Sequence, residues 1–358
     1  MEIRKLTAND KEQAETLWAL AFPEDTEAFR RFYFSYEFPV DTYYGIFEAG
    51  SLVCMVGMLP HNLKCFEKSV PAHMLRGVAT HPEKTGQGLA SMLMKYIMQQ
   101  AYVEKWPFLS LKTFIHPFYE RFGFATCTYV SDKPITAQPS EHMCVKKITA
   151  YESLGEQEFS DILSLYESYI REQNFYLVRN ERLMKNKLYE LLFVSGGLLY
   201  LVYEAQRLVG YCMAYAHETY IYGEECVFLK EEVLQHLAAD IETNAHCSFV
   251  QRKENKGETA DAMVRMVYAE TLLSMMHYRQ ERTIISLQDA FFKENQGNWC
   301  VEKNSSGIIV KKAENETADI SLSAGELAAV LFGHFPPHLE AQAKMFFVER
   351  GTGIFEQY

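Results

Sequence analysis

An α+β fold divided into several domains is predicted for this chain of 358 residues. Short apolar runs typical of strands alternate with segments in which apolar residues recur at helical spacing. One junction, over residues 74–98, joins a strand to a helix through a loop that contains two glycines. A chain of this length is longer than one hydrophobic core usually accommodates, so two or three domains are expected.

The composition is that of an ordinary globular protein, with 48% hydrophobic and 23% charged residues. The net charge is −12 and no block of Lys and Arg stands out, which argues against nucleic acid as a partner. No apolar run approaches the roughly 18 residues that span a bilayer, and the N-terminus lacks a signal-peptide core. We therefore expect a cytoplasmic protein with no membrane partner. The eight cysteines form no C-x-x-C pair, so buried thiols are expected rather than a metal site or disulfides.

The first region of the chain, residues 1–146, is expected to fold as one domain around the junction at 74–98. Its order is strand, two helices, antiparallel strands, the junction, and then strand, short helix, strand. The expected strands are 2–6, 43–48, 52–60, 75–80, 108–113 and 124–130, and the expected helices are 10–22, 26–36, one from residue 89 and a turn from residue 116.

The loop of the junction carries Gly86 and Gly88 directly before the helix that begins at Leu89. A helix N-terminus presents unpaired N–H groups and the positive end of the helix dipole, which together favour a phosphate-bearing ligand. Glycine lets such a ligand approach the backbone closely. The alternative is an ordinary turn between a strand and a helix.

Two motifs in this region resemble those of a known family. The segment GVATHPEKTGQGLASMLM, which starts at Gly77, resembles motif A of the GNAT acetyltransferases, Q/R-x-x-G-x-G/A after a strand. Gly88 and Ala90 fill the small positions, whereas Thr85 stands where the family usually has Arg or Gln. The segment YERFGF, residues 119–124, resembles the Y-x-R-F-G-F/Y signature of the Eis-like (enhanced intracellular survival) aminoglycoside acetyltransferases.

The rest of the chain agrees with that resemblance. Residues 147–262 repeat the order of the first domain, but Lys230, Glu231 and Glu232 stand where a glycine loop is expected, and acidic side chains repel phosphate. Residues 263–358 begin with a strand at 264–267 and a helix at 269–276, and continue as a ladder of strands. The resemblance implies tandem GNAT-like domains, of which the second lacks a cofactor, followed by a sterol-carrier-protein-like α+β domain. It also implies a homohexamer.

The resemblance further implies acetyl-CoA as cofactor and an amine as acceptor. The residues expected to bind the cofactor form three groups: Gly86, Gln87, Gly88, Leu89, Ala90 and Ser91 at the pyrophosphate, Val78, Ala79 and Thr80 at the pantetheine arm, and Phe114 and Ile115 where the next strand splays. Tyr119 is expected to be the general acid, because a phenol with a reference pKa of about 10 is protonated at neutral pH. A packing tyrosine is the alternative.

The general base is less clearly marked. In the Eis-like group the terminal carboxylate enters the active site, a role that falls on Tyr358 here, as base or as amine-orienting group. Glu356 is a rival carboxylate, and an exposed terminus is the alternative. Alternative bases in the first domain are His61, His73, His81 and His116.

The function expected from these residues is transfer of acetyl to a small, cationic amine, with aminoglycosides as the substrate class that the resemblance suggests. An acidic protein suits a cationic substrate through electrostatic steering, although a solubility surface also explains the charge. Two alternatives remain open: a non-catalytic acyl-CoA-binding sensor or scaffold, and a peptide or lysine N-acetyltransferase.

Overall fold

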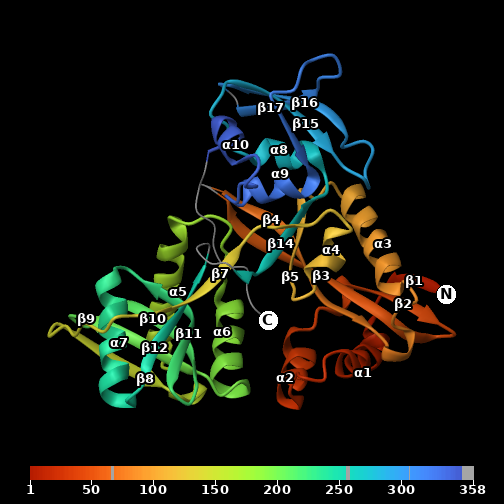
Figure 1. The fold of residues 1–358 in the computed structure, drawn as a ribbon. Helices are drawn as coiled ribbons and strands as arrows, with labels where there is room; N and C mark the ends of the chain where they lie inside the picture. The colour runs from red at the N-terminus through yellow and green to blue at the C-terminus, as the bar shows by residue number, and fades with distance from the viewer. Residues whose placement is uncertain (66–67, 255–258, 306, 349–358) are drawn as a thin grey trace.

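The computed structural model describes residues 1–65, 68–254, 259–305 and 307–348. Within these residues the strands form two seven-stranded sheets and one four-stranded sheet. Each sheet with its helices makes one lobe, and Figure 1 shows the first lobe mostly in red and orange, the second in green and the third in blue. The mixed α+β class predicted from the sequence is confirmed.

The first sheet has its strands in the order β1-β2-β3-β4-β5-β14-β6. Neighbouring strands are antiparallel except β4 and β5, which are parallel and therefore need a crossover connection, the helix α3. The bounds are β1 (Glu2–Lys5), β2 (Tyr43–Glu48), β3 (Ser51–Cys65), β4 (Lys68–Thr80), β5 (Phe108–Lys112), β6 (Ala125–Thr126), β14 (Ala262–Met266) and α3 (Leu89–Val103).

Both faces of the first sheet are covered, because alternate residues of a strand point to opposite faces. Val56 and Met58 of β3 pack in one core with residues of α3. Met55 and Leu59 of the same strand pack in another core with Trp18 of α1 (Lys11–Ala21). Helix α2 (Glu27–Phe32) and the turn after it extend this second core.

The second sheet repeats the order of the first, as β8-β9-β10-β11-β12-β7-β13. Here too the fourth and fifth strands are parallel, and α7 (Glu231–Ala245) connects them. The other bounds are β7 (Tyr129–Pro134), β8 (Met143–Ile148), β9 (Leu198–Glu204), β10 (Arg207–Ala216), β11 (Tyr220–Phe228), β12 (Ser248–Glu254), β13 (Thr259–Ala260), α5 (Glu156–Arg171) and α6 (Glu181–Tyr189).

The sixth strand of each sheet comes from the other half of this tandem. The chain leaves the first sheet after β6, and β7 pairs with β12 of the second sheet. It leaves the second sheet after β13, and β14 pairs with β5 of the first sheet. Figure 1 shows both strands running between the lobes. The two lobes have thus exchanged equivalent strands, and each sheet is completed by the other's segment.

This exchange corrects two of the sequence predictions. The strand predicted at 124–130 is divided between β6 and β7, which lie in different sheets. The strand predicted at 264–267, assigned to the third domain, is β14 of the first sheet. An apolar run has the same sequence pattern whichever sheet it joins, so the pattern does not assign a strand to a sheet. The partners of β14 also lie about 150 residues away in the sequence. The domain division at 146 and 262 stays a prediction.

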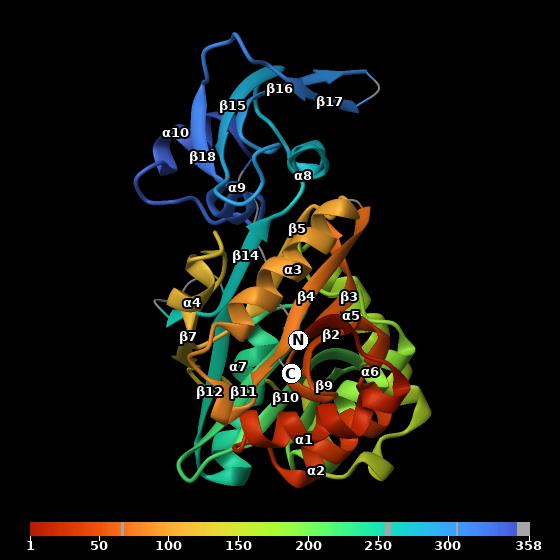
Figure 2. The same cartoon turned by 90° about the vertical axis from the view of Figure 1, so that its right-hand side faces the viewer.

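The third lobe is built on the first. Its sheet has the order β17-β16-β15-β18, and its helix α9 packs against β14 and β6 of the first sheet. Figure 2 shows this lobe above the first, with β14 running from it down into the first lobe. The bounds are β15 (Arg282–Gln288), β16 (Gly297–Asn304), β17 (Gly307–Lys312), β18 (Ile320–Ser323), α8 (Ala269–Met275), α9 (Ala324–Leu331) and α10 (Glu340–Phe346).

Two expectations from composition can be compared with this fold. All eight cysteines are thiols, and five of them are buried. Over the described residues, every helix is too short or too polar to cross a membrane.

The strand β4 contains a bulge close to its end. Met55 of β3 pairs with Ala79 and Gly57 pairs with Arg76, so that Val56 stands opposite both Gly77 and Val78. Gly77 has φ +58°, and a Cβ there would lie 2.3 Å from the ring of Trp18. A bulge bends the strand and redirects its backbone groups, which is why bulges are common beside active sites.

Substitution Gly77→Ala is expected to destabilise the protein by about 2–4 kcal/mol, because the side chain meets both a left-handed backbone and the Trp18 ring. The measurement is the free energy of unfolding in denaturant. Gly50→Ala is the matched control, since Gly50 also has positive φ but open space around its Cβ, and a cost of about 1 kcal/mol is expected there. Equal costs for the two substitutions would contradict the role given to Trp18.

Candidate active site

The parallel strands β4 and β5 separate next to the bulge. They pair at His73 with Leu109, at Met74 with Ser110 and at Leu75 with Leu111, and β4 then continues to Thr80 without β5 beside it. The carboxyl ends of diverging parallel strands are where ligands bind in many open sheets. The predicted pantetheine-binding residues Val78, Ala79 and Thr80 all belong to this separated end of β4.

The loop after β4 leads into α3 through two glycines in the left-handed region. Gly86 has φ +79°, and Gly88, the N-cap of α3, has φ +80°. A Cβ built at either glycine would have no atom within 4 Å, so the backbone there is open to an approaching group. Among the described residues no side chain caps the helix, and its first turn carries no acidic residue. The N–H groups of this turn, from Leu89 to Ser91, therefore suit the pyrophosphate of a coenzyme.

Two polar side chains of this loop form hydrogen bonds with the backbone of the loop itself, and a third is paired with β2. The Thr85 hydroxyl donates a hydrogen bond of 2.6 Å to the Pro82 carbonyl, and the Gln87 amide donates one of 3.3 Å to the Glu83 carbonyl. Lys84 forms an ion pair of 2.7 Å with Glu48 of β2. The cradle that the loop offers is thus made of backbone N–H groups, and Thr85 stabilises the loop rather than replacing an Arg or Gln that reaches outward.

Tyr119 lies in the short helix α4 (His116–Glu120) that follows β5, and its side chain is 8% exposed. Its ring packs against Phe118 and Phe124, with ring centroids 4.9 and 5.9 Å away. Burial raises the pKa of Tyr119 to about 12. The phenol therefore keeps its proton at neutral pH, as a proton donor must.

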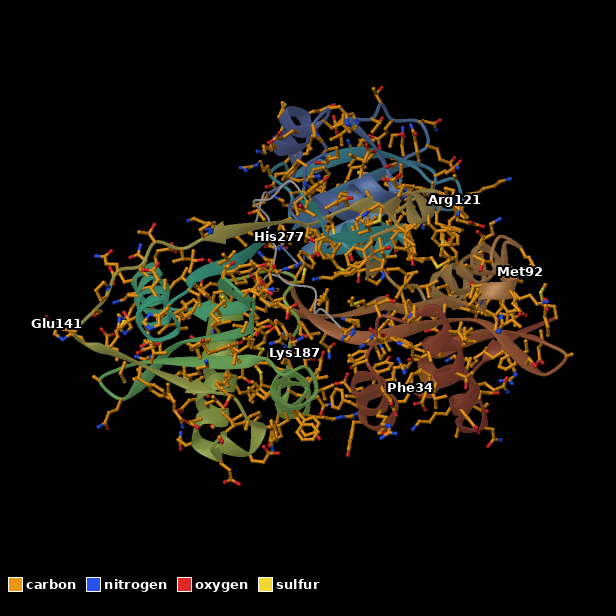
Figure 3. The ribbon with its side chains drawn as sticks, turned by 60° about the horizontal axis from the view of Figure 1, so that its bottom comes forward. Phe34, Met92, Arg121, Glu141, Lys187 and His277 are labelled. Atoms are coloured by element: carbon orange, nitrogen blue, oxygen red, sulfur yellow. The ribbon has the colours of Figure 1, made fainter. Side chains whose placement is uncertain are left out.

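The predicted residues Phe114 and Ile115 stand between β5 and Tyr119, and both side chains are exposed. They lie beyond the end of the paired part of β5, on the segment that leads into α4. Met92, in the second turn of α3, and Arg121, directly after α4, mark these two helices on the first lobe in Figure 3. The glycine loop and the Tyr119 helix thus follow the two strands that separate.

The candidate bases differ in their surroundings. His73 stacks on Trp106 with ring centroids 3.2 Å apart, and burial, assisted by the nearby His61, lowers its pKa to about 4, so it is a weak base. The Nδ1 atom of His81 accepts the N–H of Glu83 within the loop. His116 opens α4, and its buried Nε2 has no hydrogen-bond partner in the described part of the chain.

His61 lies on β3. The two carboxylates considered as bases, Tyr358 and Glu356, lie outside the described residues.

One pair of residues near Tyr119 was missed in the sequence. Arg265 of β14 and Asp289, which follows β15, form an ion pair of 2.6 Å in which both side chains are at most 1% exposed. The available signal was an arginine inside the apolar run AMVRM, residues 262–266. A charged residue in such a run requires a buried partner.

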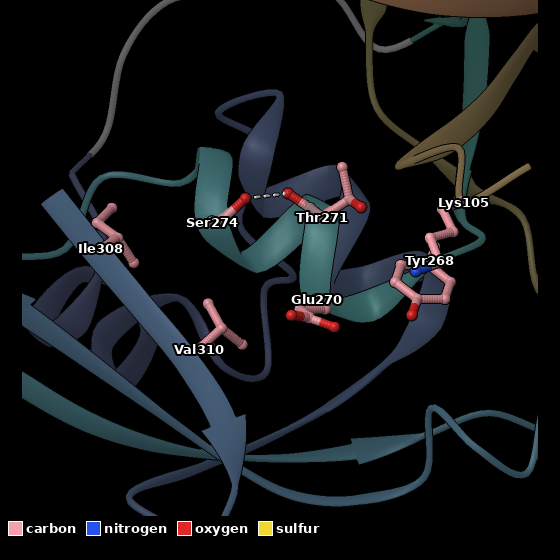
Figure 4. A pocket seen from close by; sticks show the side chains of 7 residues that line it. All are labelled: Lys105, Tyr268, Glu270, Thr271, Ser274, Ile308 and Val310. Carbon is pink, nitrogen blue, oxygen red and sulfur yellow. Dashed lines mark hydrogen bonds between the residues drawn. The ribbon is translucent and has the colours of Figure 1, made fainter.

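A cavity of about 330 Å³ lies at the interface between the first and third lobes (Figure 4). It lies beside α8 and β17, and its wall mixes side chains of opposite charge with hydroxyl groups and aliphatic side chains. Its lining residues are Lys105, Tyr268, Glu270, Thr271, Ser274, Ile308 and Val310. None of them belongs to the residues predicted for the cofactor or for catalysis.

Two family models match separate parts of the chain. Residues 2–127 match the acetyltransferase (GNAT) domain, and residues 269–345 match the sterol carrier protein domain. No curated protein matches the sequence.

Solved structures resemble the chain over its whole length. A conserved protein of Enterococcus faecalis, a probable N-acyltransferase, has a TM-score of 0.80 at 17% identity and covers 100% of this chain and 99% of its own. A GCN5-related N-acetyltransferase of Anabaena variabilis has a TM-score of 0.77 at 14% identity, with 98% of each chain covered. Eis1 of Mycobacterium abscessus has a TM-score of 0.72 at 17% identity, with 99% of each chain covered. At these identities the similarity shows the fold.

The match over residues 2–127 includes the separated strands, the glycine loop and Tyr119. The chain therefore carries a GNAT acetyltransferase domain together with a sterol carrier protein domain, and it is an N-acetyltransferase.

Proposed function

We propose that this protein transfers the acetyl group of acetyl-CoA to an amine of a small, cationic acceptor. The observation that carries the proposal is the divergence of β4 and β5 between an uncapped helix N-terminus and a buried, protonated tyrosine. The motif resemblance to the Eis-like group suggests aminoglycoside-like acceptors. The net charge of −12 favours a cationic substrate.

The residues that would hold the coenzyme follow from the backbone geometry. The N–H groups of the loop and of the first turn of α3, from Gly86 to Ser91, would bind the pyrophosphate. The backbone of Val78, Ala79 and Thr80 would bind the pantetheine arm, and an N–H group there would polarise the thioester carbonyl. Acetyl-CoA supplies the acetyl group as a thioester.

Tyr119 would donate a proton to the departing thiolate. Burial disfavours the phenolate, so the hydroxyl remains a donor throughout the neutral range and up to a pH of about 12. The acceptor amine must be neutral to attack the thioester carbonyl. The terminal carboxylate of Tyr358 would accept the proton of this amine or orient the amine. A cytoplasmic location stays a prediction from the apolar runs and the N-terminus of the sequence, and a homohexamer stays a prediction of the family resemblance.

The acceptor class can be tested with acetyl-CoA and a panel of aminoglycosides, polyamines and lysine peptides, with release of coenzyme A thiol as the readout. Turnover is expected with the small polycationic amines and not with the peptides. Cofactor binding without turnover of any amine would indicate a non-catalytic acyl-CoA sensor. Turnover of the peptides alone would indicate a peptide or lysine N-acetyltransferase.

Substitution Tyr119→Phe is expected to lower kcat by about 100-fold and to leave the KM for acetyl-CoA nearly unchanged, because only the proton donor is removed. Steady-state kinetics with the best acceptor of the panel provide the measurement. Phe118→Leu is a control, since it changes an aromatic neighbour of Tyr119 without removing a hydroxyl. A Tyr119→Phe enzyme with the wild-type rate would exclude Tyr119 as the acid.

Extension of the chain by three glycines after Tyr358 is expected to abolish activity, because the added residues move the carboxylate away from the reacting amine. Acetyl transfer and acetyl-CoA binding are measured on the same preparation, and binding is expected to survive. Full activity of the extended chain would rule out the terminal carboxylate and would return attention to His116.

A further inference from the structure

The buried ion pair between Arg265 and Asp289 contacts the turn that ends the Tyr119 helix. Arg265 belongs to β14, which is paired with β5 on one side and with β6 on the other. Its guanidinium group makes three hydrogen bonds, to the carbonyls of Phe122 and Met266 and to the carboxylate of Asp289. All the N–H groups of an arginine fork are directed in one plane, so a single side chain can join these three groups.

Two of the contacts of Arg265 concern the turn that ends α4. The Phe122 carbonyl, which accepts from Arg265, belongs to the residue whose own N–H donates to the Tyr119 carbonyl over 2.9 Å. The next residue, Gly123, has φ +79°, and a Cβ there would lie 3.3 Å from Nε of Arg265. The guanidinium group therefore holds the turn that fixes the end of the Tyr119 helix.

Asp289 is in turn held by the third lobe. Its Oδ1 accepts the N–H groups of Phe291 and Phe292, and its Oδ2 accepts the side chain of Asn295 over 2.9 Å. Phe291 packs against Phe122, with ring centroids 5.9 Å apart. The third lobe is thus connected to the Tyr119 helix by the ion pair of Asp289 with Arg265, by the hydrogen bonds that hold Asp289, and by the aromatic contact of Phe291.

The helix α4 needs such support. It contains five residues, and a helix of this length is not stable by itself in water. Proton donation also requires a definite position of the Tyr119 hydroxyl, since a displacement of about 1 Å in an active site costs as much as 100-fold in rate. The buried guanidinium group of Arg265, bound to the turn after α4, fixes the position of this helix, which α4 cannot fix by itself.

We propose that Arg265, oriented by Asp289, is a positioning residue that holds Tyr119 in place for proton donation and so makes the third lobe a requirement for catalysis. The proposal rests on the proposed role of Tyr119 as general acid. Arg265 does not touch the substrate in this scheme, and it acts only through the Phe122 carbonyl and the turn at Gly123.

A double-mutant cycle of Arg265→Lys and Tyr119→Phe tests the proposal in the full-length enzyme. Lysine keeps the positive charge beside Asp289, but its ammonium group cannot join all three acceptors in one plane. Arg265→Lys alone is expected to lower kcat about tenfold with the KM for acetyl-CoA unchanged. In the Tyr119→Phe background it is expected to lower kcat no further, because the donor to be positioned is already absent.

Two further variants separate positioning from stability. Asp289→Asn keeps an acceptor oxygen for the neighbouring N–H groups and is expected to lower kcat in the same way, also without effect in the Tyr119→Phe background. Ile284→Ala is the matched control, because Ile284 is a buried residue of β15 in a small separate cluster with Cys300 and Ala313. It is expected to lower the Tm and to leave kcat unchanged well below the Tm.

The outcomes are distinct. If Tyr119→Phe lowers kcat and Arg265→Lys lowers it by the same factor in both backgrounds, Arg265 does not act through Tyr119 and the positioning proposal is wrong. Wild-type kcat in both Arg265→Lys and Asp289→Asn also overturns it. If Tyr119→Phe itself keeps the wild-type kcat, the acid role fails first, and positioning through Tyr119 fails with it.

Discussion

The pairing of β14 with β5 is the constraint on which the first lobe of this molecule depends. It places Ala262, Met263, Val264 and Met266 in the cores of the first and third lobes, each with no exposed surface. Complete burial of such a side chain as Val or Met contributes about 1.5–3 kcal/mol. The same strand provides β6 with its partner and α9 with its packing surface, and it brings Arg265 behind the Tyr119 helix. Without β14 the segment after β5 would lack its support.

The tandem lobes share a fold but differ at the helix that follows their fourth strand. In the first lobe α3 begins at a left-handed glycine with no acidic residue in its first turn. In the second, α7 begins at Lys230 in an extended conformation and carries Glu231 and Glu232 in its first turn. Carboxylates there already neutralise the positive end of the dipole and repel a phosphate. In β11, beyond the part that pairs with β12, Glu225 is bound by Arg179 and Tyr211 in a buried cluster. The second lobe therefore shares the strand exchange but differs from the first in the features that suit a coenzyme.

The sequence predicted the parts of the site that are local. The loop with Gly86 and Gly88 and the helix at Leu89 are coded by neighbouring residues, and the structure has them where the motif predicted. The strand exchange was not predictable in the same way, because alternation of apolar residues does not specify the partner of a strand. Arg265 was overlooked for the same reason, since its partners are a carbonyl at 122 and a carboxylate at 289. The hydrogen bond of Thr85 within its own loop depends on the fold of that loop, which the residue types alone do not specify.

The third lobe contacts the first through its packing and its hydrogen bonds. Gly325 of α9 approaches so closely that a Cβ would lie 2.7 Å from the Gly123 carbonyl, so the helix touches the turn after α4 from one side. Arg265 and Asp289 hold the same turn through the Phe122 carbonyl. A five-residue helix has too few hydrogen bonds to fix its own orientation, and these contacts fix it from outside. The precise position that Tyr119 needs for proton donation would then be set by residues that take no part in the chemistry. This contact would also explain why a sterol carrier domain is fused to an acetyltransferase domain.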